Sequence, residues 1–382
     1  MTIARVVAGG DGLGRAADGR VVFVPAALPG ERVRIALVDE RADFARGRLL
    51  DVLDASPDRQ APPCPFVAAG CGGCGWQHVV PAAQVELKLG IVKEALARTG
   101  GMPEAVVAPG PALPDRGFRT TVRLAVDPDG RLGFRVRRGH DMVPIDACLV
   151  AHPLLAELLA TPVPGADEVT LRCGANTGER LAFIEPRRVA APVGWPSDVR
   201  VGAHAHIHEV VAGHHFRISA RSFFQTRVDG AEALVAAVRD AVDGEARGRR
   251  VVDAYAGVGL FAATVDGASS IVAVERAPSA VFDARHNVPG LRVVEADVAR
   301  WKPSAAEVVI ADPSRDGLGR AAVKVLAGCG ARRMVLVSCD PVSLARDAKL
   351  LAGLGYEHVR SVVIDLFPHT PHIETVSRFD RR

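Results

Sequence analysis

Residues 251–263, with the sequence VVDAYAGVGLFAA, combine a short apolar strand, a glycine-rich turn and the start of a helix. Gly257 and Gly259 allow a ligand to approach the backbone closely at the turn. Four more apolar runs follow, IVAVE, LRVVEAD, VVIAD and MVLVSC, with helical segments between them. This alternation predicts a parallel sheet covered by helices, so we expect an α/β, Rossmann-like domain from about residue 219 onwards.

Three of these predicted strands end in acidic residues: Glu275, Asp297 and Asp312. In open parallel sheets, ligands bind at the carboxyl ends of the strands, so these side chains should share a crevice with Gly257. Glu275 follows Asp253 by 22 residues, where an acid would take the ribose hydroxyls of a nucleoside cofactor. The acids favour an adenosyl ligand. The glycine spacing of residues 257–262 also fits the dinucleotide fingerprint, so a nicotinamide-dependent oxidoreductase is a second interpretation.

The segment VLVSCDPVSLARD, residues 335–347, places a thiol between a strand and a helix. Asp340 has the character of a helix N-cap and Pro341 that of a first helical residue. Cys339 therefore ends the strand after Asp312 and should face the same crevice. A helix N-terminus favours negative charge, so we expect a lowered thiol pKa and a nucleophile at this position. A buried structural cysteine is the alternative.

The bulk composition restricts the class of protein. The chain has 382 residues, 48% hydrophobic and 24% charged residues, and a net charge of +3. No run of eighteen uncharged apolar residues occurs, which excludes a membrane-spanning helix, and the N-terminus lacks the apolar core of a signal peptide. We therefore expect a cytoplasmic globular protein. Its small net charge does not by itself indicate a nucleic-acid partner.

The remaining sequence predicts two further domains. Residues 1–58 alternate apolar and polar positions between glycine turns, which indicates a small β-barrel. We assign 59–78 and 111–218, rich in cysteine and short strands, to a central domain. The amphipathic helix expected at 82–100 joins the catalytic domain, which comprises 79–110 and 219–382.

Four cysteines form a candidate metal site. Cys64, Cys71 and Cys74 lie in one glycine-rich segment, and Cys148 could complete the set from the central domain. Four thiolates suit zinc and iron–sulfur clusters about equally well, and the spacing does not distinguish them. Cys173 and Cys329 have the character of buried structural cysteines.

Several motifs together identify a family. VSCDPVSLARD (337–347) resembles the nucleophile motif of the RNA uracil-5-methyltransferases, and three other segments resemble its remaining signatures: RSFFQTR (221–227), DAYAGVGLF (253–261) and PHTPHIETV (368–376). Residues 1–58 resemble a TRAM domain, an RNA-binding barrel of the oligonucleotide-binding type. CPFVAAGCGGCGWQH (64–78) resembles the iron–sulfur segment of the ribosomal-RNA branch. One departure is DPSRDGLG (312–319), where the family usually has a second proline and no acid after the arginine.

The resemblance implies a class I methyltransferase fold and an activity. Addition of the Cys339 thiolate to carbon-6 of uracil would make carbon-5 nucleophilic towards S-adenosylmethionine, and Glu374 would then remove the carbon-5 proton. The implied cofactor contacts are Gln225, Tyr255, Glu275 and Asp312, to which the strand-end pattern adds Gly257 and Asp297. Phe223 and Phe224 are expected in the core. The cysteine segment favours a 4Fe-4S cluster over zinc, held by Cys64, Cys71, Cys74 and Cys148.

The implied partner is RNA, with 23S ribosomal RNA favoured and transfer RNA as the alternative. The target base must leave its stack or lie in a single strand to reach the thiol. We expect no membrane and no obligate protein partner. The competing interpretations are an iron–sulfur oxidoreductase using a nicotinamide, a non-catalytic RNA-binding protein, and a methyltransferase directed at cytosine.

Overall fold

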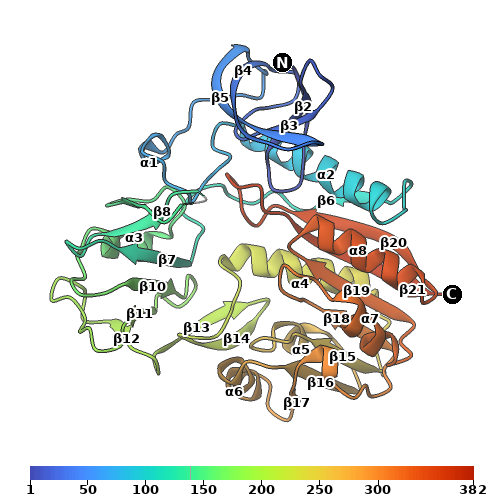
Figure 1. Cartoon of the computed structure of the whole chain (residues 1–382). Coiled ribbons are helices and arrows are strands. Elements are labelled where there is room, and N and C mark those ends of the chain that lie inside the picture. The colour runs from blue at the N-terminus through green and yellow to red at the C-terminus, as the bar shows by residue number, and fades with distance from the viewer. Residues whose placement is uncertain (138) are drawn as a thin grey trace.

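The computed structural model describes residues 1–137 and 139–382 and arranges their strands in four sheets (Figure 1). The largest, the C-terminal sheet, has the strand order β17-β16-β15-β18-β19-β21-β20-β6. Neighbouring strands are parallel except at β21, which is antiparallel to both β19 and β20. The strands are β6 (Val107–Pro109), β15 (Arg250–Ala254), β16 (Ser270–Glu275), β17 (Arg292–Glu295), β18 (Val308–Ala311), β19 (Arg333–Ser338), β20 (Tyr356–Ile364) and β21 (Glu374–Arg381). This confirms the predicted α/β domain.

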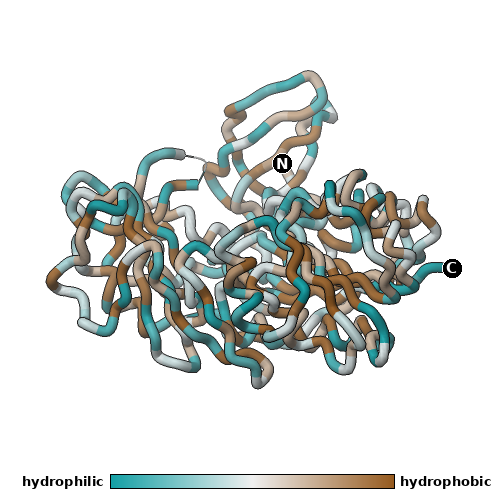
Figure 2. The backbone as a smooth tube through the Cα atoms, turned by 90° about the horizontal axis from the view of Figure 1, so that it is seen from below, coloured by the Kyte–Doolittle hydropathy of each residue, from teal (hydrophilic) through white to brown (hydrophobic). Residues whose placement is uncertain are grey.

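Alternate residues of the C-terminal sheet face two separate cores. Val252 and Val309 belong to one cluster of buried side chains, whereas Val251 and Val308 belong to the other. Because both faces are covered, the strands consist of continuous apolar runs instead of alternating ones. Apolar segments accordingly run through the middle of this part of the molecule in Figure 2.

Helices cover both faces of the C-terminal sheet (Figure 1). One core includes residues of α2 (Pro81–Arg98), α7 (Gly319–Ala327) and α8 (Pro341–Ala352). The other includes residues of α4 (Val228–Val242) and α5 (Leu260–Thr264). The remaining connections contain α6 (Pro278–Asn287) and the short 3-10 helix η1 (Val298–Arg300). Across 1–137 and 139–382, no helix is both long and apolar enough to cross a membrane.

The central sheet has six strands in the order β12-β11-β10-β7-β8-β9. They are β7 (Thr121–Val126), β8 (Leu132–Arg135), β9 (Met142–Pro144), β10 (Glu168–Cys173), β11 (Arg180–Glu185) and β12 (Val199–Val201). Helix α3 (Pro153–Leu159) packs on this sheet, whereas the short α1 (Pro65–Ala68) lies in the cysteine segment. A separate hairpin, β13 (His206–Val211) and β14 (His214–Ser219), connects this region to α4.

The N-terminal sheet corrects the predicted barrel. Its five strands are β1 (Ile3–Val6), β2 (Gly12–Arg15), β3 (Val21–Val24), β4 (Arg32–Glu40) and β5 (Phe44–Asp54). They pair in the order β1-β2-β3-β5-β4. The two end strands are joined by an isolated bridge between Thr2 and Arg32 and not by a continuous ladder, so the sheet is not a closed barrel. The alternation of apolar and polar positions predicted strands here, but closure depends on long-range register.

Candidate active site

The order of the strands reverses between β15 and β18, which are neighbours although β16 and β17 separate them in the sequence. Ligands of open α/β sheets bind at the carboxyl ends of the strands at such a reversal. The turn after β15 contains Gly257 and Gly259 at φ values of 55° and 90°. Tyr255, at φ 61°, adopts the same left-handed region despite its side chain, which costs backbone strain. Glycine is required here by the conformation itself.

Two carboxylates hold the glycine turn. Asp253 accepts a hydrogen bond from the Ala262 amide (2.9 Å), and Glu275 accepts one from the Gly257 amide (2.9 Å). Within the described residues, the second carboxylate oxygen of Asp253 is buried without a hydrogen-bond partner. Burial, together with the charges of Asp312 and Glu275, raises the pKa of Asp253 to about 7. Asp253 therefore supports the turn, a role that the sequence pattern had not given it.

Most predicted cofactor residues lie at this edge of the sheet. Each of the following is the last residue of a parallel strand or comes shortly after one: Tyr255, Gly257, Glu275, Asp297 and Asp312. Burial and the nearby charge of Asp297 raise the pKa of the Tyr255 phenol to about 12. Gln225 comes from elsewhere, because it lies buried in the segment between β14 and α4.

Cys339 lies between β19 and α8, as predicted. The Asp340 side chain caps the helix by accepting a hydrogen bond from the Ser343 amide (2.7 Å), and Pro341 is the first helical residue. The thiol itself is half-buried. This local arrangement was readable from the sequence because both capping signals act within one turn of the helix.

The predicted lowering of the Cys339 pKa is wrong. Burial raises the pKa of this thiol to about 12, and the charges of Glu374 and Asp312 act in the same direction, while Arg315 opposes them. The helix N-terminus does not compensate, because the Asp340 carboxylate already occupies it. In the free protein the thiol is therefore protonated at neutral pH.

Glu374 is the neighbour of Cys339 across two antiparallel strands. Ser338 on β19 pairs with Thr375 on β21, which brings the residues adjoining this pair, Cys339 and Glu374, together. Glu374 is only 4% exposed. Burial, and then the charge of Asp312, raise its pKa well above that of an ordinary glutamate.

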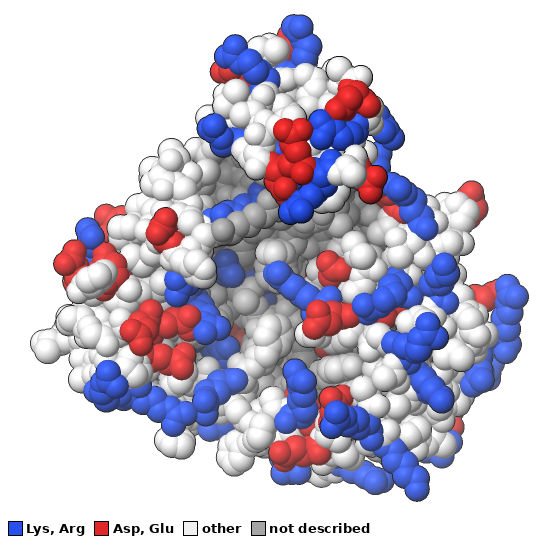
Figure 3. Space-filling model, viewed as in Figure 1, with Lys and Arg blue, Asp and Glu red and all other residues white. Residues whose placement is uncertain are grey.

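A cavity of about 300 Å³ contains Cys339 and is lined by several distant parts of the chain. The lining residues are Gly9 of the N-terminal sheet, Gly72, Gly73 and Gly75 of the cysteine segment, Arg137 of the central region, and Arg315, Asp340, Pro341, Thr370, Pro371 and His372 of the C-terminal part. We call this space the Cys339 cleft. Figure 3 shows a hollow where the three parts of the molecule meet, with both basic and acidic side chains around its rim.

Buried hydrogen bonds fix the parts that form the Cys339 cleft. The Trp76 amide donates to the His369 carbonyl (2.7 Å), and the Trp76 indole N–H donates to the Gly10 carbonyl (3.2 Å). The His369 amide donates to the Gln84 side chain (2.6 Å). The N-terminal sheet, the cysteine segment, helix α2 and the loop before Glu374 are therefore held relative to one another.

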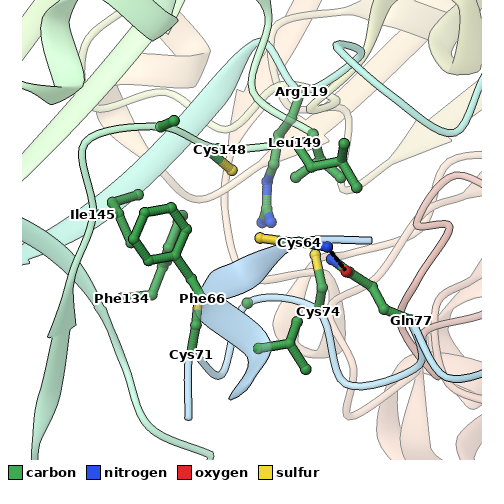
Figure 4. A pocket seen from close by; sticks show the side chains of 14 residues that line it. Cys64, Phe66, Cys71, Cys74, Gln77, Arg119, Phe134, Ile145, Cys148 and Leu149 are labelled. Carbon is green, nitrogen blue, oxygen red and sulfur yellow. Dashed lines mark hydrogen bonds between the residues drawn. The ribbon is translucent and has the colours of Figure 1, made fainter. Parts of the chain in front are cut away.

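The four cysteines of the predicted metal site line a second pocket (Figure 4). Phe66 and Phe134 enclose it, and the Arg119 guanidinium points into it (Figure 4). Burial raises the pKa of Cys74 to about 11, with smaller contributions from neighbouring thiols. Among residues 1–137 and 139–382, no group of three His, Cys, Asp or Glu side chains is close enough to form a metal site in this arrangement.

The sequence reasoning missed several residues of these sites. Arg137 and His372 line the Cys339 cleft, and Arg119 enters the cysteine pocket. His372 lies in the quoted segment PHTPHIETV, which could have drawn attention to it, whereas Arg137 and Arg119 lie in no such motif. Phe223, expected in the core, is 67% exposed, whereas Phe224 is buried as expected. Cys173 and Cys329 are buried, also as expected.

Known proteins resemble the chain over its whole length. Residues 2–50 match the TRAM domain. An RNA methyltransferase of Streptomyces avermitilis is 34% identical, with 99% of this chain and 96% of the relative covered. The 23S rRNA (uracil(1939)-C(5))-methyltransferase of Alkalilimnicola ehrlichii is 32% identical, with 95% and 92% covered. The chain belongs to the RNA uracil-5-methyltransferase family.

The solved structures agree with this assignment at the level of the fold. One similar structure is that of the Pyrococcus abyssi tRNA (uracil-54, C5)-methyltransferase in complex with S-adenosyl-L-homocysteine. The match covers 99% of each chain, with a TM-score of 0.79 and 24% sequence identity. This RNA uracil-5-methyltransferase thus acts on RNA and has the fold of a class I methyltransferase. The oxidoreductase and non-catalytic interpretations are wrong, and the dinucleotide spacing of residues 257–262 reflects the shared shape of nucleoside-binding turns.

Proposed function

We propose that this enzyme methylates carbon-5 of a uridine in RNA through a covalent bond between Cys339 and carbon-6 of the base. The observation that carries the proposal is the placement of Cys339 and Glu374 side by side across β19 and β21. A nucleophile and a carboxyl group beside one cleft are the two groups that this reaction requires.

The proposed reaction has three steps. The Cys339 thiol gives its proton to water and its sulfur bonds to carbon-6, which turns the base into an enolate with a nucleophilic carbon-5. S-adenosylmethionine, when bound, would supply the electrophilic methyl group to carbon-5 and leave as S-adenosylhomocysteine. The Glu374 carboxylate then removes the proton from carbon-5, the electron pair restores the 5,6 double bond, and the bond from carbon-6 to sulfur breaks.

The raised pKa values fit this sequence of steps. Before RNA binds, a protonated Cys339 thiol avoids a further negative charge beside Glu374 and Asp312 in a partly buried site, and the raised pKa of Glu374 has the same cause. A carboxyl group with a raised pKa is also a stronger base once it ionises, which suits the removal of a proton from carbon. The same environment that keeps Cys339 unreactive in the free protein therefore favours the last step.

Ribosomal RNA is the favoured substrate and transfer RNA the alternative. The relative from Alkalilimnicola ehrlichii carries the name of a 23S rRNA enzyme, while the similar structure from Pyrococcus abyssi is that of a tRNA enzyme. In either RNA the target uridine must be extruded or unpaired to enter the Cys339 cleft.

We also propose a division into three domains, which comprise residues 1–58, residues 59–78 with 111–218, and residues 79–110 with 219–382. The pairing of β6 with β20 supports the placement of 79–110.

The proposal is tested by nucleoside mass spectrometry of separated ribosomal and transfer RNA from a deletion strain. We expect 5-methyluridine to disappear from one position of ribosomal RNA and to return when the gene is restored. Loss of a methylated cytidine instead, with 5-methyluridine unchanged in both RNA fractions, would refute the uridine assignment.

For the cysteine pocket we propose a 4Fe-4S cluster held by Cys64, Cys71, Cys74 and Cys148. A single zinc ion requires sulfur atoms about 4 Å apart, given a Zn–S distance of about 2.3 Å. A cluster spreads its four ligands further apart, and the four thiols line one pocket in which the charges of Cys148 and Cys64 act on Cys71. The cluster would hold the cysteine segment, because methyl transfer involves no change in oxidation state of a metal.

Protein purified without oxygen should therefore be brown and contain about four irons per chain. Replacement of Cys71 by serine should remove the iron and lower the yield of folded protein, because ligand loss destabilises the segment. Cys329→Ser is the matched control, since Cys329 lies buried in the core of the C-terminal sheet, and its iron content should stay unchanged. Iron analysis and the visible absorption spectrum provide the measurement. Stoichiometric zinc without iron would contradict the cluster.

A further inference from the structure

Arg315 occupies an unusual position beside the nucleophile. It follows β18 and lines the Cys339 cleft, and its side chain is exposed. One guanidinium nitrogen lies 3.2 Å from each of the two ring nitrogens of His372. The guanidinium is therefore held against an aromatic ring at the cleft wall and not free in solvent.

The positive charge of Arg315 is not neutralised by the protein. In the described residues, no carboxylate forms an ion pair with Arg315, although many other arginines of the chain have one. Its contact, His372, cannot compensate: burial, with the charges of Arg315 and Lys88, lowers the pKa of His372 to about 4. The ring is neutral at physiological pH, so Arg315 presents a guanidinium without a paired carboxylate to the cleft.

A second arginine reaches the same cleft from the central region. One nitrogen of Arg137 donates to the Gly9 carbonyl (3.1 Å) and to Asp11 (3.1 Å), which fixes the side chain across two parts of the molecule. Its other terminal nitrogen would lie 3.9 Å from a Cβ atom placed on Gly75. The glycines of the cysteine segment thus leave this wall without side chains, and a bulky ligand can approach the backbone there.

We propose that Arg315, supported by His372, binds the backbone phosphate that adjoins the target nucleotide, and that Arg137 adds a second contact to the same strand. Guanidinium groups bind phosphate through paired, charge-assisted hydrogen bonds. The Asp340 carboxylate, which lines the same cleft as Cys339, would repel a phosphate, so the strand is held at Arg315 while the base alone reaches the thiol.

This inference rests on the proposed function and adds a contact whose binding energy offsets the cost of base extrusion. Taking a base out of its stack costs a few kcal/mol, which contacts elsewhere on the nucleotide must offset. A phosphate contact at the edge of the cleft supplies such binding energy without sequence preference. Arg315 lines the same cleft as the nucleophile, and its charge acts on Cys339, so it is placed to provide this contact.

The test uses a 12-nucleotide single-stranded RNA of adenosines with one central uridine. Arg315→Gln should weaken its binding about tenfold, the value of one charge-assisted contact, and should lower the slope of log affinity against log salt by about 0.7. Arg292→Gln, at an exposed arginine of the edge strand β17, is the matched control and should leave both quantities unchanged. Binding of S-adenosylmethionine should be the same in all three proteins.

A second measurement identifies the phosphate. A neutral methylphosphonate placed on the 5′ or the 3′ side of the uridine should cost wild-type binding about tenfold at one of the two positions. In Arg315→Gln the same replacement should cost nothing, because the charge partner is already gone. The proposal would be overturned if Arg315→Gln and the methylphosphonate replacement lowered the RNA affinity independently and additively. It would also be overturned if Arg315→Gln and Arg292→Gln lowered the affinity equally. Exchange of the uridine for cytidine tests the base preference separately, so a failure of the proposed function is distinguishable from a failure of the phosphate site.

Discussion

The Cys339→Ala variant should lose methyl transfer to RNA by at least about 10⁴-fold while it still binds S-adenosylmethionine. Removal of a catalytic nucleophile commonly costs this much or more, because no other group can form the covalent bond. The remaining cysteines are held elsewhere: Cys173 and Cys329 are buried, and the other four line the cysteine pocket. The measurement is the transfer of a labelled methyl group, with cofactor binding measured in parallel.

RNA that carries 5-fluorouridine at the target position makes this prediction specific. After methyl transfer, carbon-5 would carry fluorine in place of the proton, and fluorine cannot leave as a cation, so the wild-type enzyme should stay covalently attached. The adduct should require S-adenosylmethionine and should map to the peptide that contains Cys339. Cys339→Ser should be nearly as inactive as Cys339→Ala, because a hydroxyl group ionises far less readily than even this thiol. Methylation of uridine by a Cys339→Ala protein that binds cofactor normally would disprove the covalent mechanism.

The parts of this enzyme that were predictable from sequence depend on local signals. Propensities within a few residues predict the strand, turn and helix around Gly257. They also predict the start of α8 at Asp340 and Pro341. The family motifs located Cys339 and Glu374 as single residues. These features were predictable because short stretches of sequence carry them, whereas the register of β19 against β21, which places Cys339 beside Glu374, is a long-range contact.

The features that were not predictable depend on contacts between distant segments. The thiol pKa at Cys339 was predicted from the helix N-terminus alone, but two carboxyl groups from other strands, together with burial, reverse its direction. The roles of Arg137 and His372 likewise arise from the meeting of three parts of the chain at one cleft. The open N-terminal sheet belongs to the same class, because closure depends on the register between β1 and β4.

The second large effect is expected for Glu374→Gln. Glutamine has the same shape but cannot accept the carbon-5 proton, so addition of Cys339 and methyl transfer should proceed once and the enzyme should then remain attached to methylated RNA. We expect turnover to fall about 10²- to 10⁴-fold, the usual contribution of a general base. With labelled S-adenosylmethionine, the label should appear in a protein–RNA adduct at up to one equivalent per enzyme, and free methylated RNA should appear only slowly.

The pH dependence of the elimination step follows from the protonation state of the Glu374 carboxyl group. Below its raised pKa, Glu374 already holds a proton and cannot take another, so the wild-type elimination step should become faster as pH rises through that pKa. Glu374→Gln should lack this dependence in the same step, whereas Glu357→Gln, an exposed residue of β20, should behave like the wild type. Release of methylated RNA by Glu374→Gln at the wild-type rate would show that another group removes the proton. Asp312, whose pKa is raised to about 7 and whose charge acts on both Cys339 and Glu374, would then be the nearest candidate.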